Sequence, residues 1–132
     1  MKNHLNPLVN LQNLLTKINK RIEVLIDRDH MIGHSYFMDV LDLDQLKSAF
    51  ENKIIPLLQE YFYGDYGKIG LVLGKNFVTI TAKEDDVFTD FKYVGKEELN
   101  QPIYKLSDFK DLNFSKAVLN LMGINTEDIA EA

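Results

Sequence analysis

The sequence predicts an α+β fold in which a helical part is followed by a small β-containing extension that ends in a helix. Apolar residues recur at helical spacing up to about Leu73. The segment Val78–Thr81 is β-branched and alternating, which is typical of a strand. We expect residues 1–75 to form the helical part and residues 76–132 the extension, either as two units or packed together as one.

The first predicted helix spans about Pro7 to Asp27. Asn6 can cap its free N–H groups, and proline is tolerated at the first helical position. Its apolar residues follow i, i+3, i+4 and i+7 steps and therefore share one face: Leu8, Leu11, Leu14, Leu15, Ile18, Ile22, Leu25 and Ile26. The following segment, Asp27–Phe37, has no clean period and contains Gly33, so we expect an irregular connection.

A second helix is expected to begin at Asp42, where Gln45 completes a loose capping box. Helical spacing continues to Phe62 with Pro56 inside the pattern. Proline lacks a backbone donor and clashes with the preceding turn, so we expect a kink or a break near Ile54–Ile55.

Gly64–Asp65 is expected to end this element, with Asp65 capping a short third helix that Gly74 stops after about Leu73. In the extension we expect two weaker strands, Val87–Phe88 and Ile103–Leu106. A last helix, Phe114–Met122, should end before Gly123, and the acidic end Thr126–Ala132 should be frayed.

Composition narrows the classes of function. The net charge of −5 disfavours a dedicated DNA-binding domain, because phosphate contacts require a basic surplus. The absence of cysteine excludes disulfides and thiolate metal sites. No apolar run approaches the ~20 residues that span a bilayer, and no signal-peptide pattern is present, so we expect a cytoplasmic protein without a membrane partner.

The usual catalytic signatures are missing. Leu73–Asn76 contains a Gly-Lys pair but lacks the first glycine and the hydroxyl residue of a phosphate-binding loop. His30 and His34 have a spacing used by zinc sites, but Gly33 argues against a regular helix there, so two ordinary turn histidines are favoured and no metal is expected. Ser35 beside His34 is not expected to act as a hydrolase pair, because adjacent residues rarely face each other and nothing marks an oxyanion hole.

The glycines at 64, 67, 70 and 74 suit a turn and helix ends better than a phosphate cradle. The aromatic residues between Tyr61 and Tyr66 could stack on nucleic-acid bases. Their helical spacing and their acidic neighbours favour a core and a partner surface instead.

Two segments resemble the C-terminal part of McrB-type AAA+ NTPases, the motor subunits of modification-dependent restriction systems. They are Ile32–Phe37, preceded by Asp27–His30, and Lys53–Tyr63. The resemblance covers about Leu14 to Gly74, near half of the chain. It is specific, because a Gly-His-Ser-Tyr-Phe string followed by a Pro-Leu-Leu-Gln-Glu-Tyr-Phe string rarely arises by chance.

The resemblance implies a helical AAA+ lid-like subdomain. In that family GTP or ATP with magnesium binds between a nucleotide-binding core and the lid, within a ring that is usually a hexamer. The Walker motifs, the first sensor and the arginine finger belong to the core and are absent here, so we expect an assembly fragment that is inactive alone and holds no cofactor. The implied partners are the core domain, neighbouring ring subunits and a McrC-like nuclease subunit, with no direct DNA binding.

The resemblance also implies site residues. Gly33, His34 and Ser35 stand before a lid helix, where many AAA+ proteins carry a second sensor arginine, and no arginine is present in this string. We expect these three residues to lie near the nucleotide or to fix the lid against the core, although they could simply shape a turn. The residues expected to pack the lid or form its interface are Tyr36, Phe37, Pro56, Tyr61 and Phe62.

Two other functions remain open. The chain could be a stand-alone protein-interaction domain derived from such a motor. It could also be a small enzyme that uses His30 or His34.

Overall fold

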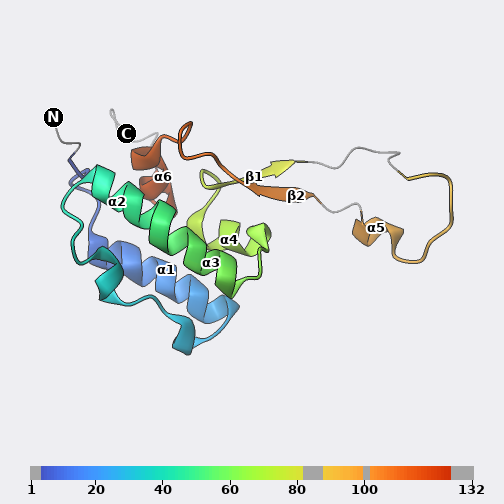
Figure 1. Cartoon of the computed structure of the whole chain (residues 1–132), viewed down its shortest axis with the longest axis horizontal. Helices are drawn as coiled ribbons and strands as arrows, with labels where there is room; N and C mark the ends of the chain where they lie inside the picture. Colours follow the sequence, from blue (N-terminus) through green and yellow to red (C-terminus); the bar gives the residue numbers. More distant parts are fainter. Residues whose placement is uncertain (1–3, 82–87, 100–101, 126–132) are drawn as a thin grey trace.

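Most helices form one body, and a two-stranded ribbon projects from it (Figure 1). The computed structural model describes residues 4–81, 88–99 and 102–125. The elements in chain order are α1 (Leu11–Leu25), 3₁₀ turns at Arg28–His30 and His34–Phe37, α2 (Leu43–Ala49), a π-helical turn (Phe50–Ile54), α3 (Ile55–Tyr61), α4 (Tyr66–Leu73), β1 (Val78–Thr81), α5 (Lys96–Leu99), β2 (Ile103–Leu106) and α6 (Phe114–Leu121). This mixture of helices and one antiparallel sheet confirms the predicted α+β class. None of the helices in these ranges is long and apolar enough to cross a membrane.

The predicted start of the first helix at Pro7 is wrong. Asn6 closes only an isolated turn, in which its Oδ1 accepts from the Leu8 N–H at 2.9 Å. Asn10 is the true cap, with an extended backbone and an Oδ1 that accepts from the Asn13 N–H at 3.1 Å. Either asparagine side chain can cap a helix, and the neighbouring sequence does not indicate which of the two does so. The helix ends at Leu25, two residues before the predicted end.

The predicted cap of the second helix is confirmed. Asp42 Oδ1 accepts from the Gln45 N–H at 2.8 Å, and Gln45 Oε1 accepts from the Leu41 N–H at 2.6 Å. At Pro56 the chain does not break. The preceding turn widens instead, so that the Ile55 N–H bonds to the Phe50 carbonyl, five residues earlier. A widened turn accommodates a proline that cannot donate a hydrogen bond.

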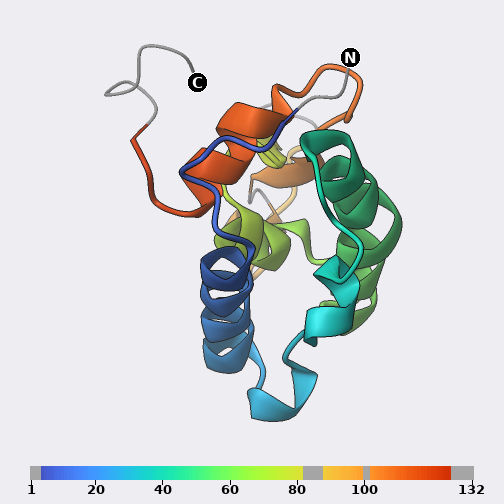
Figure 2. The same ribbon diagram turned by 90° about the vertical axis from the view of Figure 1, so that its left-hand side faces the viewer.

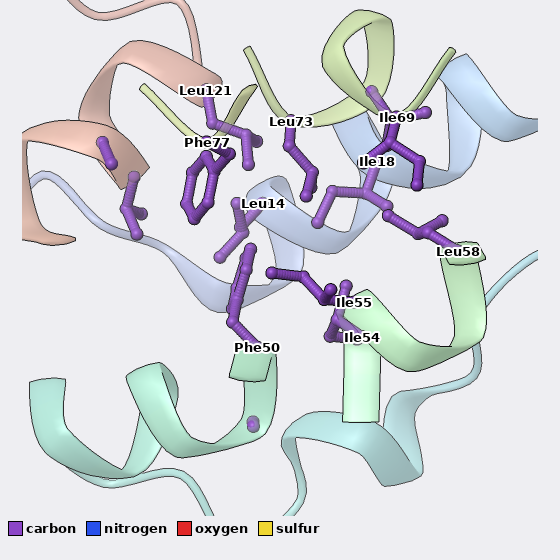
Figure 3. Packing of buried hydrophobic residues seen from close by; sticks show 14 of the residues in the cluster. Leu14, Ile18, Phe50, Ile54, Ile55, Leu58, Ile69, Leu73, Phe77 and Leu121 are labelled. Carbon is purple, nitrogen blue, oxygen red and sulfur yellow. The ribbon is translucent and has the colours of Figure 1, made fainter. Parts of the chain in front are cut away.

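One hydrophobic core combines side chains from both predicted parts of the chain (Figure 3). Its centre is Phe50, which is fully buried. The Phe50 ring stacks on Phe77 with centroids 5.5 Å apart and meets Phe114 edge-on at 5.4 Å. The division of the chain between residues 75 and 76 stays a prediction, but the extension contributes to the same core as the helices.

Arg21 ties three helices together. Its guanidinium donates from Nη1 to the Val72 carbonyl and from Nη2 to the Leu121 carbonyl, both at 2.8 Å. These carbonyls lie in the last turns of α4 and α6, where the helix itself supplies no partner. Partial burial lowers the pKa of Arg21 from its ordinary value.

Gly67 lets α4 lie close to the ribbon, because a Cβ at this position would lie 3.2 Å from the Tyr104 ring. A Cβ on Gly70 would lie 3.4 Å from the Val78 Cβ, which is an ordinary contact distance. The glycine at 67 therefore serves close packing between a helix and the ribbon, in addition to the turn and helix ends that were predicted for this glycine pattern. That prediction holds for the glycines at 64 and 74, whose φ angles are +76° and +97°.

The extension differs in part from its prediction. The strand Ile103–Leu106 is confirmed and pairs antiparallel with β1. Phe88 lies in a bend rather than in a strand, and Val87 lies outside the described residues. The short helix α5 was not predicted. Helix α6 ends one residue before the predicted Met122, and the predicted frayed end, Thr126–Ala132, also lies outside the described residues.

Candidate functional site

The connection between α1 and α2 carries the residues predicted to face a nucleotide. It runs from the end of α1 to the start of α2, past the two 3₁₀ turns (Figure 2). Asp27 caps the first turn, with its Oδ1 accepting from the N–H groups of Asp29 at 3.0 Å and His30 at 3.1 Å. The same oxygen lies 2.6 Å from His30 Nδ1, and this hydrogen bond lowers the pKa of Asp27 below its ordinary value.

Asn19 anchors the middle of this connection to α1. Its Nδ2 donates to the Ile32 carbonyl at 2.9 Å, and its Oδ1 accepts from the Ile32 N–H at 2.6 Å. The Ile32 side chain is buried in the core. Sequence reasoning missed this role of Asn19. The available signal was an asparagine inside an amphipathic helix, where a better helix former would otherwise be favoured.

Phe37 anchors the other end. Its buried ring stacks on Phe50, with centroids 6.2 Å apart and planes 17° from parallel. Between the two anchors, Gly33, His34 and Ser35 are exposed. The connection therefore presents three solvent-facing residues from a backbone that is held on both sides.

Gly33 has an ordinary backbone conformation, with φ −81° and ψ 164°. A Cβ built on Gly33 would meet one atom, Ser35 Oγ, at 4.0 Å. Neither strain nor crowding among the described residues requires glycine here. If glycine matters at this position, the reason lies in what approaches the loop from outside.

His34 lies beside the start of α1. It lines a shallow hollow of about 330 Å³ together with Phe37 and three residues from the first turns of α1: Leu11, Gln12 and Leu15. The first N–H groups of a helix lack partners within it and carry a partial positive charge. The His34 imidazole and the start of α1 lie in one region, and both can bind anionic oxygen atoms. Ser35, the next residue in the chain, adds a hydroxyl to the exposed loop.

The five residues predicted to pack the lid or form its interface differ in how deeply they are buried. Phe37 and Phe62 belong to the core, Tyr36 and Tyr61 are half-buried, and Pro56 is exposed. Burial raises the pKa of Tyr61, and Tyr36 and Glu60 add to the shift.

Tyr61 connects α3 to the first 3₁₀ turn. Its ring meets the His30 ring edge-on, with centroids 4.9 Å apart. The neighbouring Tyr63 is almost fully exposed. The aromatic run of residues 61–66 therefore divides between internal packing and open surface.

The two histidines of the possible metal pair lie in different surroundings. His30 contacts Asp27 and Tyr61, whereas His34 lines the hollow beside α1. Within the part of the chain that the structure describes, no three histidine, aspartate or glutamate side chains are grouped to hold a metal ion. In the same part, no hydrogen bond joins the side chains of His34 and Ser35.

Comparison with protein families matches residues 10–70 to the family described as McrB, alpha-helical lid domain. The matched segment begins at the cap of α1 and ends inside α4, so it includes the Gly33–Ser35 loop and both of its anchors. No curated protein matches the chain.

Proposed function

Because residues 10–70 match the McrB alpha-helical lid domain family, we propose that this chain serves as the lid and assembly part of a McrB-like AAA+ motor. The observation that carries the proposal is the exposed Gly33–Ser35 loop within the matched segment, held at one end by Asn19 and at the other by Phe37. A loop anchored on both sides can keep its groups in place for a ligand bound by another domain.

In this proposal the nucleotide is GTP or ATP with magnesium, and the upstream core domain binds it. His34 and Ser35 lie nearest to the phosphates, where they donate hydrogen bonds alongside the start of α1. Gly33 lets the core backbone or the nucleotide approach closely. No residue of this chain performs the hydrolysis, so the chain is inactive alone.

The lid acts mechanically. Nucleotide binding and hydrolysis shift the lid relative to the core, and the lid transmits the shift to the next subunit. Transmission requires a lid that moves as a unit. The Arg21 ties to α4 and α6 and the shared core around Phe50 support such rigid movement. The partners are the core domain, neighbouring ring subunits and a McrC-like nuclease subunit of a 5-methylcytosine-type restriction system.

The test uses the purified 132-residue chain and a McrB-type AAA+ core that lacks its own lid. GTP and ATP hydrolysis is measured for the chain alone, for the core alone and for the mixture. We expect no turnover by the chain, weak turnover by the core and a several-fold increase in the mixture. The variant His34→Ala should reduce the increase.

The matched control is His4→Ala, a histidine substitution in an exposed position that does not line the hollow beside α1. It should leave the stimulation unchanged. Nucleotide hydrolysis by the chain alone, or a mixture that is no faster than the core, would refute the proposal.

A second candidate function is a stand-alone interaction domain. The observation that favours it is the group of exposed apolar side chains between Phe88 and Leu99, which lie apart from the hydrophobic core. A reading frame that carries a Walker A motif and continues into this chain would exclude it.

A further inference from the structure

The far end of the projecting arm carries an aromatic tip, which we define as Phe88, Phe91, Tyr93 and Val94. Figure 1 shows this segment, with α5, away from the helical body. The four side chains are exposed, Phe91 by 67% of its surface, and none belongs to the hydrophobic core. Three of them surround a hollow of about 260 Å³ with α5. Apolar side chains gathered on a projection are typical of a binding element.

The base of the same arm carries a ribbon groove. This groove of about 790 Å³ lies between α4 and the strands, and its apolar lining includes Gly70, Leu71, Val78, Ile80 and Tyr104. Leu71 and Ile80 are exposed by 66% and 67%. The missing side chain at Gly70 leaves the floor of the groove open, next to Val78.

The tip and the groove of one chain do not meet. Val78, Ile80 and Tyr104 form one wall of the groove and also belong to the ribbon that carries the tip away from it. Figure 1 shows the tip at the opposite end of this ribbon. A groove occupant that resembles the tip must therefore come from another molecule.

The charges of the two surfaces are complementary. The groove is lined by two lysines, Lys68 and Lys75, and one acid, Asp65. Within residues 4–81, 88–99 and 102–125, neither lysine forms an ion pair. The segment 88–99, which contains the tip, carries three acids and two lysines, and Asp90 lies next in sequence to Phe91. An apolar groove lined by more lysines than acids fits a projection with an apolar end and a surplus of acids.

We propose that the aromatic tip of one copy binds in the ribbon groove of a second copy. The groove takes the rings of Phe91 and Tyr93 against Leu71 and Ile80, and Lys75 lies opposite the acids of the tip. The contact is head-to-tail, because each copy offers a tip at one end and a groove at the other. Contacts of this type build closed rings or open filaments. The proposal does not depend on the function proposed above.

The test uses the absence of cysteine in this chain. The single variants Phe91→Cys and Leu71→Cys are prepared in the full chain, one of them isotopically labelled, and then mixed and oxidised. We expect a disulfide-linked dimer that contains one labelled and one unlabelled copy. Its yield should exceed several-fold that of a control mixture of Phe91→Cys with Val24→Cys, since Val24 is exposed on α1 and does not line the groove.

A second measurement follows self-association by sedimentation. The variants Tyr93→Ser and Leu71→Glu should each raise the dissociation constant by about tenfold or more, as expected for losing a central apolar contact. Both positions are exposed, and circular dichroism should show an unchanged fold. Lys75→Glu should weaken association, and combining it with Asp90→Lys should restore part of the loss.

Two outcomes would overturn the proposal. The first is a mixed disulfide yield equal to that of the Val24 control. The second is a chain that stays monomeric at all concentrations, which would leave the groove to a different macromolecule. Both outcomes concern only contacts between copies, so they are distinguishable from a failure of the nucleotide hydrolysis test.

Discussion

The side-chain amide of Asn19 pairs with both backbone polar groups of Ile32, 13 residues further along the chain. This pair fixes the connection directly before the exposed Gly33–Ser35 loop. We expect Asn19→Ala to destabilise the chain by about 1–3 kcal/mol, because it leaves a partly buried N–H and carbonyl without partners. Urea denaturation measures the loss, and faster hydrogen exchange of the Ile32 amide locates it.

Lys20→Ala is the matched control for Asn19, because Lys20 is an exposed neighbour on the same helix. It should change stability by less than about 0.5 kcal/mol. An Ile32 amide that exchanges equally slowly in wild type and Asn19→Ala would show that the pair does not hold the connection.

Arg21 should be sensitive to a conservative change. We expect Arg21→Lys to cost about 2 kcal/mol, because a single ammonium group cannot replace a fork that reaches Val72 and Leu121 at once. Chemical denaturation provides the measurement. The exposed Arg28→Lys serves as control and should have almost no effect. Equal stability of the two variants would contradict the structural role of Arg21.

The hydrogen bond from His30 predicts a pH dependence for the first 3₁₀ turn. The pKa of Asp27 is lowered in the folded chain, so its contribution to stability is present above the unfolded value of about 3.9. It is lost as the pH falls through the lower folded pKa. The carboxyl carbon shift of Asp27, followed by NMR, should titrate below the unfolded value.

The substitution His30→Ala isolates the cause of this shift. It removes the largest contribution and should move the Asp27 midpoint back toward the ordinary value. An unchanged midpoint in this variant would assign the shift to the backbone N–H groups of Asp29 and residue 30 instead.

A substitution at Gly33 tests whether this glycine is needed for the fold or for the proposed function. We expect Gly33→Ala to change the stability of the isolated chain by less than about 0.5 kcal/mol, because its φ is negative and the added Cβ has room. In the mixture with an AAA+ core, the same variant should reduce the stimulation of hydrolysis.

Gly64→Ala is the comparison variant, and it should lower the stability of the chain. Gly64 also has no neighbour within 4 Å of an added Cβ, but its φ is +76°. Alanine in this left-handed conformation should cost about 1–2 kcal/mol. If Gly33→Ala proved as destabilising as Gly64→Ala, the loop glycine would be structural.

The sequence correctly predicted those helix ends that depend on one hydrogen bond between residues close in the chain. Asp42 and Asp65 cap their helices as expected, each accepting from the N–H three residues later. Gly74 stops α4 with a positive φ. The prediction failed where two nearby residues, Asn6 and Asn10, could each cap the same helix. At Pro56 the sequence identified the irregularity, but helical spacing alone does not distinguish a broken helix from a widened turn.

The candidate site was predictable only in part. The loop residues Gly33, His34 and Ser35 came from a resemblance in sequence, and the structure adds that they are exposed between two anchors. The anchors themselves join distant positions, Asn19 to Ile32 and Phe37 to Phe50. Contacts of this kind depend on how helices pack, and no local spacing encodes them. That these three residues lie near a nucleotide stays a prediction.

The seat of the ribbon on α4 couples the position of the strands to the rotation of this helix. Gly67 faces the Tyr104 ring and Gly70 faces Val78, so the helix meets both strands of the ribbon. A rotation of α4 about its axis would therefore shift the base of the ribbon with it. A side chain larger than alanine at position 70 would push Val78, and with it the first strand, away from the helix.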